Sequence, residues 1–127
     1  MTKNEALKLL TIYGKAWVTR DPDLIITIFT EDANYNDPHE PENIGREAIR
    51  IYWKNKVIGE QTDITFDLKN VWVDGDVVIA EWRATFKDIK RNLHINLKEI
   101  AVFTVKDGKF SSLREYYKST KTPISAS

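Results

Sequence analysis

The sequence predicts an α+β domain in which three N-terminal helices pack against one face of a curved antiparallel sheet. Apolar residues recur at helical spacing up to Gly59, and after it apolar and polar residues alternate as they do in strands. Two Asp-Gly pairs, at 74–75 and 107–108, are typical of tight hairpin turns. Helices followed by a run of antiparallel strands indicate a layer of helices on a sheet.

Each of the three helices has a recognisable start signal. Thr2 and Glu5 fit a capping box, in which each side chain bonds the backbone of the other. Asp21 is placed as an N-cap, with Pro22 at the first helical position. A third helix is expected at about 46–57, with Gly59 as its stop.

A short extended segment, residues 33–36, separates the second and third helices and ends at Asp37-Pro38. Proline fixes its own φ and biases the preceding residue toward extended geometry. A carboxylate held between two helices in this way is a candidate for chemistry. The alternative is that Asp37 only caps the turn, as aspartates before proline often do.

Four strands are expected after Gly59, and the alternation slips near Lys69-Asn70, which predicts a β-bulge. Several of these strands are longer than the usual five or six residues, so they should twist and curl around the helices. A curled sheet closed by helices leaves a cone with an apolar interior. The whole chain, 1–127, is expected to be one domain with its core at about 5–119 and a polar tail, 120–127, that frays.

Composition excludes several classes of function. Acidic and basic residues balance at 19 each, which argues against a nucleic-acid partner. The chain has no cysteine, no apolar run long enough for a membrane span and no apolar leader, so we expect a cytoplasmic protein without a membrane partner. His39 and His94 form no metal-ligand pattern, and no nucleotide-binding fingerprint is present. Neither a metal nor a cofactor is expected.

Four segments together resemble the nuclear transport factor 2-like superfamily, in particular its SnoaL-like and ketosteroid-isomerase-like members. They are W-x-x-x-D-P-D-L at 17–24, F-T-E-D-A-N-Y-N-D-P at 29–38, G-R-E-A-I-R-I-Y-W at 45–53 and D-G-K-F-S-S-L-R-E-Y-Y at 107–117. The resemblance covers nearly the whole chain and implies the cystatin-like cone with an internal cavity. It says little about function, because this fold hosts isomerases, cyclases, dehydratases, hydrolases and binding domains.

The resemblance also implies a set of catalytic positions. Asp37 matches the general base of ketosteroid isomerase, and Tyr13, 24 positions earlier, matches the tyrosine of its oxyanion hole. The second oxyanion donor of the isomerase is a protonated aspartate, and that position here is Ala101. Glu99 precedes it by two residues on the same strand face and is the candidate replacement.

Glu99 interrupts an otherwise apolar strand face. If it is buried, it must be protonated or paired, because an unpaired buried carboxylate is costly. The alternative is that the strand register is shifted by one residue and Glu99 faces solvent. Tyr13 has a similar alternative, because a tyrosine on a buried helical stripe is often only a core residue. We expect the remaining ligand-binding residues to converge on the cone; they are Trp17, Tyr35, Trp53, Trp82, Glu115 and Tyr117.

Two classes of function remain open. The first is a small enzyme that acts on an apolar, carbonyl-bearing ligand as an isomerase, cyclase or dehydratase, with Asp37 as general base. The second is a non-catalytic domain of the same fold that binds a small molecule or dimerises. The strand face opposite the helices carries Val77, Ile79, Ile100 and Val102, with Trp72 added by the bulge. Because no element is left to cover this patch, we expect a homodimer joined sheet to sheet.

Overall fold

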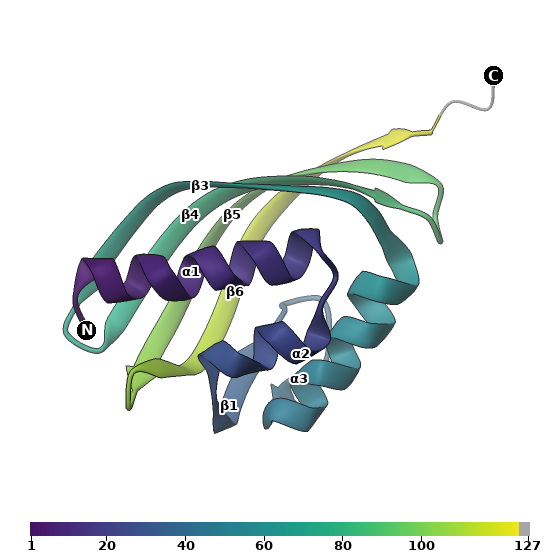
Figure 1. Ribbon diagram of the computed structural model, residues 1–127. Helices are drawn as coiled ribbons and strands as arrows, with labels where there is room; N and C mark the ends of the chain where they lie inside the picture. The colour runs from purple at the N-terminus through teal and green to yellow at the C-terminus, as the bar shows by residue number, and fades with distance from the viewer. Residues whose placement is uncertain (125–127) are drawn as a thin grey trace.

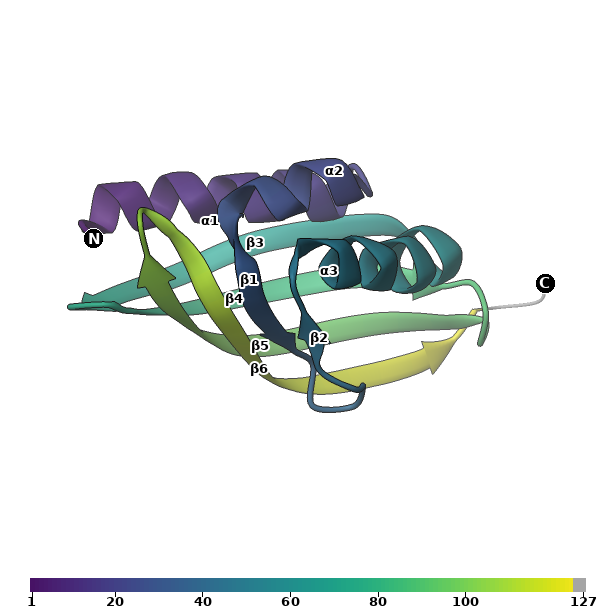
Figure 2. The same ribbon diagram turned by 90° about the horizontal axis from the view of Figure 1, so that it is seen from below.

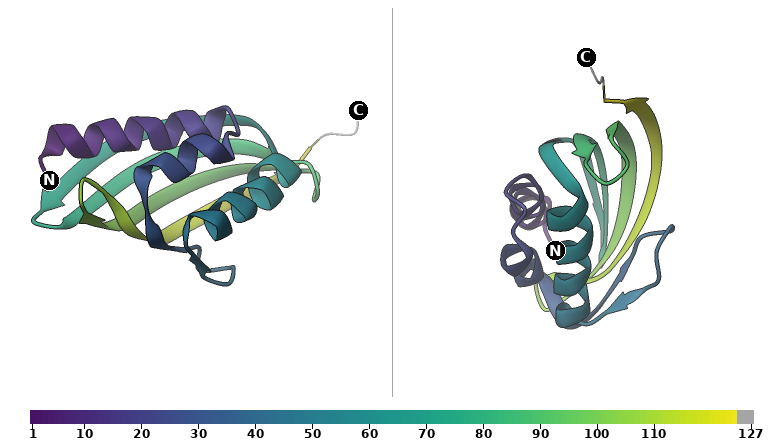
Figure 3. Two further views of the ribbon diagram at one scale, coloured as in Figure 1. Left: turned by 60° about the horizontal axis from the view of Figure 1, so that its bottom comes forward. Right: turned by 90° about the vertical axis from the view of Figure 1, so that its right-hand side faces the viewer.

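The computed structural model describes residues 1–124 and shows a curved six-stranded sheet with three helices on its concave face (Figures 1 and 3). The helices are α1 (Lys3–Val18), α2 (Pro22–Ile25) and α3 (Arg46–Trp53), with a 3-10 turn η1 (Ile26–Ile28) and a π-helical turn η2 (Lys54–Ile58). The strands are β1 (Phe29–Asn36), β2 (Asn43–Ile44), β3 (Gln61–Asp74), β4 (Val77–Asp88), β5 (Leu93–Lys106) and β6 (Lys109–Pro123). The α+β class is therefore confirmed.

The sheet is mixed, and this corrects the expectation of an antiparallel sheet. The strand order is β2-β1-β6-β5-β4-β3, and β1 pairs in parallel with β6 through Tyr35 and Leu113. Figure 2 shows β1 beside β6, with the short β2 outside it. The extended segment expected at 33–36 starts earlier, at Phe29, because Phe29 and Ala33 are buried and their backbone groups need partners.

The predicted helix starts are confirmed. Thr2 Oγ1 accepts the backbone N–H of Glu5 at 3.1 Å, and a Glu5 carboxylate oxygen accepts the backbone N–H of Thr2 at 3.1 Å. Asp21 Oδ1 accepts the backbone N–H groups of Asp23 and Leu24 at 3.1 and 3.0 Å. The third helix occupies its expected range, but its last turn is π-helical.

The inner faces of the long strands follow the predicted alternation. The inward residues Val78, Ala80 and Trp82 of β4 are fully buried, and the predicted bulge appears between Leu68 and Asn70 of β3. A second irregularity, which the sequence did not indicate, lies between Thr62 and Thr65, where Asp63 has a φ of 52°.

The polar end of the chain is more ordered than expected. Strand β6 continues to Pro123, so that Ser119 pairs with Leu97 and Pro123 pairs with Leu93 on β5. The expectation that the tail frays from residue 120 is therefore wrong for 120–123, and its last part, 125–127, lies outside the described residues. Without this extension, the first half of β5 would have unpaired backbone groups along one side.

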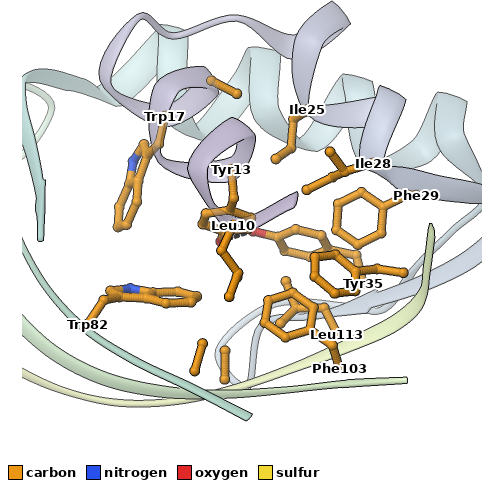
Figure 4. Close-up of a cluster of buried hydrophobic side chains, with 14 of the residues drawn as sticks. Leu10, Tyr13, Trp17, Ile25, Ile28, Phe29, Tyr35, Trp82, Phe103 and Leu113 are labelled. Carbon is orange, nitrogen blue, oxygen red and sulfur yellow. Dashed lines mark hydrogen bonds between the residues drawn. The ribbon is translucent and has the colours of Figure 1, made fainter. Parts of the chain in front are cut away.

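The core fills the space between α1, α2 and the concave face of the sheet. Figure 4 shows Tyr13 of α1 surrounded by Trp17, Trp82 and Tyr35. At the other end of the sheet, where β4 and β6 end and β5 begins, the side chains do not fill the interior. This end contains the cavity described next.

Candidate functional site

Asp37 lies directly after β1 and is only 5% exposed. Its Oδ2 accepts the hydroxyl of Tyr52 at 2.6 Å. Its Oδ1 accepts the hydroxyl of Tyr117 at 3.0 Å and the backbone N–H of His39 at 3.0 Å. The carboxylate therefore both caps the turn before Pro38 and forms part of the cavity wall.

The two tyrosines that bind Asp37 are neutral donors. Burial raises the pKa of Tyr52 and of Tyr117 far above the usual tyrosine value, and the hydrogen bonds to Asp37 raise both further. Tyr52 comes from α3 and Tyr117 from β6, so Asp37 is oriented by two separate elements. This arrangement fixes the orientation of the Asp37 carboxylate in the cavity wall.

A second group of polar side chains lies deeper, around Tyr13. Its hydroxyl is 3.3 Å from the hydroxyl of Tyr35, and it donates to Glu115 Oε1 at 3.5 Å. The indole N–H of Trp53 donates to the Tyr35 hydroxyl at 3.4 Å. Burial raises the pKa of Tyr13 and of Tyr35 well above the usual value, so both act as neutral phenols.

Glu99 is buried, with an exposed fraction of 3%, so the alternative register in which it faces solvent is excluded. Burial raises its pKa well above the usual glutamate value, and the neighbouring Glu115 raises it further. Burial also raises the pKa of Glu115 to about 7, although a hydrogen bond from Glu99 opposes that rise. The stronger rise of the pKa of Glu99, together with its hydrogen bond to Glu115, makes Glu99 the proton donor of this pair and Glu115 the acceptor.

These groups face one cavity of about 310 Å³. Its wall contains Tyr13, Trp17, Tyr35, Asp37, Trp53, Glu99, Glu115 and Tyr117, which are the sequence-predicted site residues except one. The exception is Trp82, which does not line the cavity. Its ring lies against Tyr13, with 5.0 Å between ring centroids, because its position on β4 is covered by α1. The structure therefore does not bring Trp82 together with the other predicted site residues in the cavity wall.

The mouth of the cavity is polar and charged. Arg91 pairs with Glu60 at 2.8 Å and with Asp88 at 2.9 Å. Lys56, on η2, pairs with Glu40 at 3.4 Å and with Glu60 at 3.7 Å. The positive charges of these two side chains are thus already matched by acidic neighbours at the mouth.

Sequence reasoning missed several side chains of the wall, and two of these, Tyr52 and Gln61, hold predicted site residues in place. Tyr52 flanks the buried Ile49–Trp53 face of α3, and its hydrogen bond to Asp37 depends on the angle at which α3 crosses the sheet. Gln61 accepts the indole N–H of Trp17 at 2.8 Å and so fixes that ring in the wall. A polar residue at the start of a strand gives no signal of such a contact.

Residues 1–124 contain no group of three or more His, Cys, Asp and Glu side chains placed to hold a metal ion. Within the same range, no helix is long and apolar enough to cross a membrane.

Comparison with models of protein families identifies the family of this chain. The family model of the SnoaL-like domain matches residues 11–113, which is most of the chain. The chain belongs to the SnoaL-like family. No curated protein sequence matches it.

Solved structures resemble this SnoaL-like domain in fold. An LEH-like epoxide hydrolase from M. tuberculosis is 18% identical, with a TM-score of 0.75 over 91% of this chain and 84% of the other. A type 2 hexachlorocyclohexane dehydrochlorinase is 17% identical, with a TM-score of 0.80 over 98% and 89%. A hypothetical protein with a ketosteroid isomerase-like fold from Catenulispora acidiphila, in complex with trimethylamine, is 20% identical, with a TM-score of 0.77 over 86% and 84%. At these identities the likeness shows a shared fold.

Proposed function

We propose that this SnoaL-like domain is a cofactor-independent enzyme that moves a proton on a small, largely apolar ligand held in the cone, with Asp37 as general base. The observation that carries this proposal is the position of Asp37. It is a buried carboxylate in the wall of a cavity, oriented from two sides by Tyr52 and Tyr117. A base fixed in this way is ready to accept a proton from a bound carbon acid.

The deeper donors fit the second half of such a reaction. When Asp37 removes a proton from the carbon next to a carbonyl, the electron pair of the broken C–H bond moves onto the carbonyl oxygen. The neutral hydroxyl of Tyr13 and the protonated Glu99 line the same cavity, and the ligand oxygen would replace Glu115 as the acceptor of their hydrogen bonds. Return of the proton to a second carbon gives an isomerase, and loss of a leaving group gives a dehydratase.

A non-catalytic binding domain is the second candidate. Asp37 accepts three hydrogen bonds, so both of its carboxylate oxygens are already occupied by donors of the protein. The Tyr13 hydroxyl is likewise already occupied by Tyr35 and Glu115. These contacts favour a cavity that binds a ligand without converting it.

Replacement of Asp37 separates the two candidates. We expect wild-type protein to accelerate hydrogen–deuterium exchange next to the carbonyl of at least one compound in a panel of small cyclic and aryl ketones, measured by NMR in D₂O. Asp37→Asn should lower that rate by about 10²–10⁴-fold and leave ligand affinity largely intact. Absence of exchange from the wild type, or equal exchange in the variant, would leave the binding domain as the better description.

A ketosteroid is expected to be a poor substrate. Ala101 occupies the position of the second oxyanion donor, and Glu99 is displaced from it by two residues along β5. Efficient conversion of 5-androstene-3,17-dione by the purified protein would contradict this expectation.

We also propose that the domain is a homodimer joined through the convex face of the sheet. Ile100, Trp72 and Tyr116 are exposed on strands of this sheet, and the three helices lie on its opposite face. Exposed apolar patches of this kind commonly mark an interface.

A further inference from the structure

The interior of the cavity is acidic, and its acids have no protein counter-ion. Asp37, Glu99 and Glu115 are all buried in its wall. None of them takes part in an ion pair in the described part of the chain. Of the lysines and arginines around the cavity, Lys56 and Arg91 are paired with acids at the mouth, and Lys121 is exposed near the end of β6.

Glu99 is the least satisfied of these acids. Its Oε2 is completely buried and has no partner at full hydrogen-bond geometry, and neither does the indole N–H of Trp82, the residue opposite on β4. The Trp82 indole lies near enough to lower the pKa of Glu99 slightly, against the larger rise caused by burial. The titratable groups that act on Glu99 come from every neighbouring element, and all are acidic or phenolic. They are Glu115 and Tyr117 on β6, Asp37 after β1, Tyr35 on β1 and Tyr13 on α1. A buried polar atom without a partner indicates that a ligand group belongs there.

The remaining wall is aromatic. Seven aromatic side chains line the cavity, and they are Tyr13, Trp17, Tyr35, Tyr52, Trp53, Phe86 and Tyr117. The faces of such rings attract cations, and cages of this type recognise substituted ammonium groups. Buried carboxyl groups supply the opposite charge. A neutral carbonyl ligand would use the donors of this cavity but would leave its negative charge unmatched.

We propose that the cavity is specific for a ligand carrying an organic ammonium group with apolar substituents, with the cationic centre held against Glu99 and Glu115. This inference rests on the proposed function, because it takes the cone as the ligand site. It goes further by specifying that the ligand is positively charged. The apolar body of the ligand then lies against the aromatic wall and presents its reacting carbon to Asp37.

Choline and 3,3-dimethylbutan-1-ol test this proposal, because they have the same shape and differ by one charge. We expect choline to bind at pH 8 at least tenfold more tightly than the alcohol, measured by NMR titration of the tryptophan indole N–H signals. The charge of choline does not change with pH. Its affinity should therefore fall at least tenfold between pH 8 and pH 5.5, where the carboxyl group of Glu115 becomes protonated.

Two variants locate the effect. Glu115→Gln keeps the size of the side chain and removes the charge that the carboxylate carries at pH 8, so it should reduce choline affinity at that pH at least tenfold and leave the alcohol's affinity unchanged. Glu81→Gln, on the outer face of β4, is the matched control and should bind choline like the wild type. Equal binding of choline and the alcohol, or choline binding that is insensitive to pH from 5.5 to 8, would overturn the proposal even if a variant failed to fold.

The test of the ammonium ligand and the test of the proposed proton transfer can fail independently of each other. Preference for choline without Asp37-dependent proton exchange would contradict the proposed proton transfer alone. Asp37-dependent exchange on neutral ketones without any preference for choline would contradict the ammonium proposal alone.

Discussion

Gly14 lies on the buried face of α1, directly against the ring of Phe66 on β3. A Cβ built at this position would lie 2.5 Å from Phe66 Cδ1 and 2.8 Å from Cε1. The Phe66 ring cannot easily retreat, because it also packs against Trp17 and Trp82, with centroid separations of 6.0 and 5.2 Å. Glycine at this site thus allows the helix to approach the sheet beside the cavity wall.

Gly14→Ala is expected to destabilise the protein. Alanine is favoured over glycine in a helix by about 1 kcal/mol, but overpacking of this kind costs roughly 1–3 kcal/mol. The net free energy of unfolding in urea should therefore fall. Gly59→Ala is the matched control, because its Cβ would lie 3.6 Å from the carbonyl oxygen of Lys54, an ordinary contact, and it should be neutral or slightly stabilising. A Gly14→Ala variant as stable as the wild type would show that Phe66 can move.

At the residue scale, the sequence predicts which side chains point into the interior of the protein. It predicts less well which hydrogen-bond partners those side chains have there. The placement of Asp37 after an extended segment, and of Glu99 on an apolar face, could both be predicted from periodicity and from Pro38. The hydroxyl contacts of Tyr52 and Tyr117 with Asp37 could not be predicted. They join residues 15 and 80 positions apart, and their geometry depends on how α3 and β6 meet.

At the scale of elements, the two strands β5 and β6 place Glu99 and Glu115 side by side on the concave face. Alternation alone predicts that both face inward. The parallel pairing of β1 with β6 and the extension of β6 to Pro123 were not predicted. A polar strand end such as Ser119–Pro123 has no apolar period, and it becomes a strand because β5 offers unpaired backbone groups.

This pair of acids should make stability depend on pH. Both carboxyl groups have raised pKa values in the folded state, and that of Glu115 is about 7. Between pH 4.5 and 7 the folded state therefore binds more protons than the unfolded state, and the free energy of unfolding falls as pH rises. The slope is at most about 1.4 kcal/mol per pH unit for each proton.

Glu115→Gln is expected to flatten this dependence and to stabilise the protein at pH 8 relative to the wild type. The variant removes the group that titrates near pH 7 and one of the causes of the raised pKa of Glu99. Urea unfolding at pH 5, 6, 7 and 8 measures the slope, and Glu81→Gln should retain the wild-type slope. An unchanged slope in Glu115→Gln would mean that the pair does not hold a proton in the folded state.

At the scale of the whole molecule, no helix or strand among residues 1–124 covers the convex face of the sheet. The three helices lie on the concave face, as the right-hand view of Figure 3 shows. Trp72, Ile100 and Tyr116 are 51%, 37% and 53% exposed, and Ile100 pairs directly with Tyr116 between β5 and β6. Ile79 and Val102, which pair between β4 and β5, are half-buried and extend the same patch.

Ile100→Lys should therefore convert a homodimer into a monomer of 14.7 kDa without loss of the fold. The substitution places two like charges near the proposed two-fold axis, and an uncompensated charge in an apolar interface is costly. Sedimentation at micromolar concentration measures the assembly, and circular dichroism checks that the sheet remains. Ile89→Lys is the control, because Ile89 is also exposed, at 54%, but lies in the loop after β4. Wild-type protein that sediments only as a monomer would contradict the dimer, and so would an Ile100→Lys variant that stays dimeric.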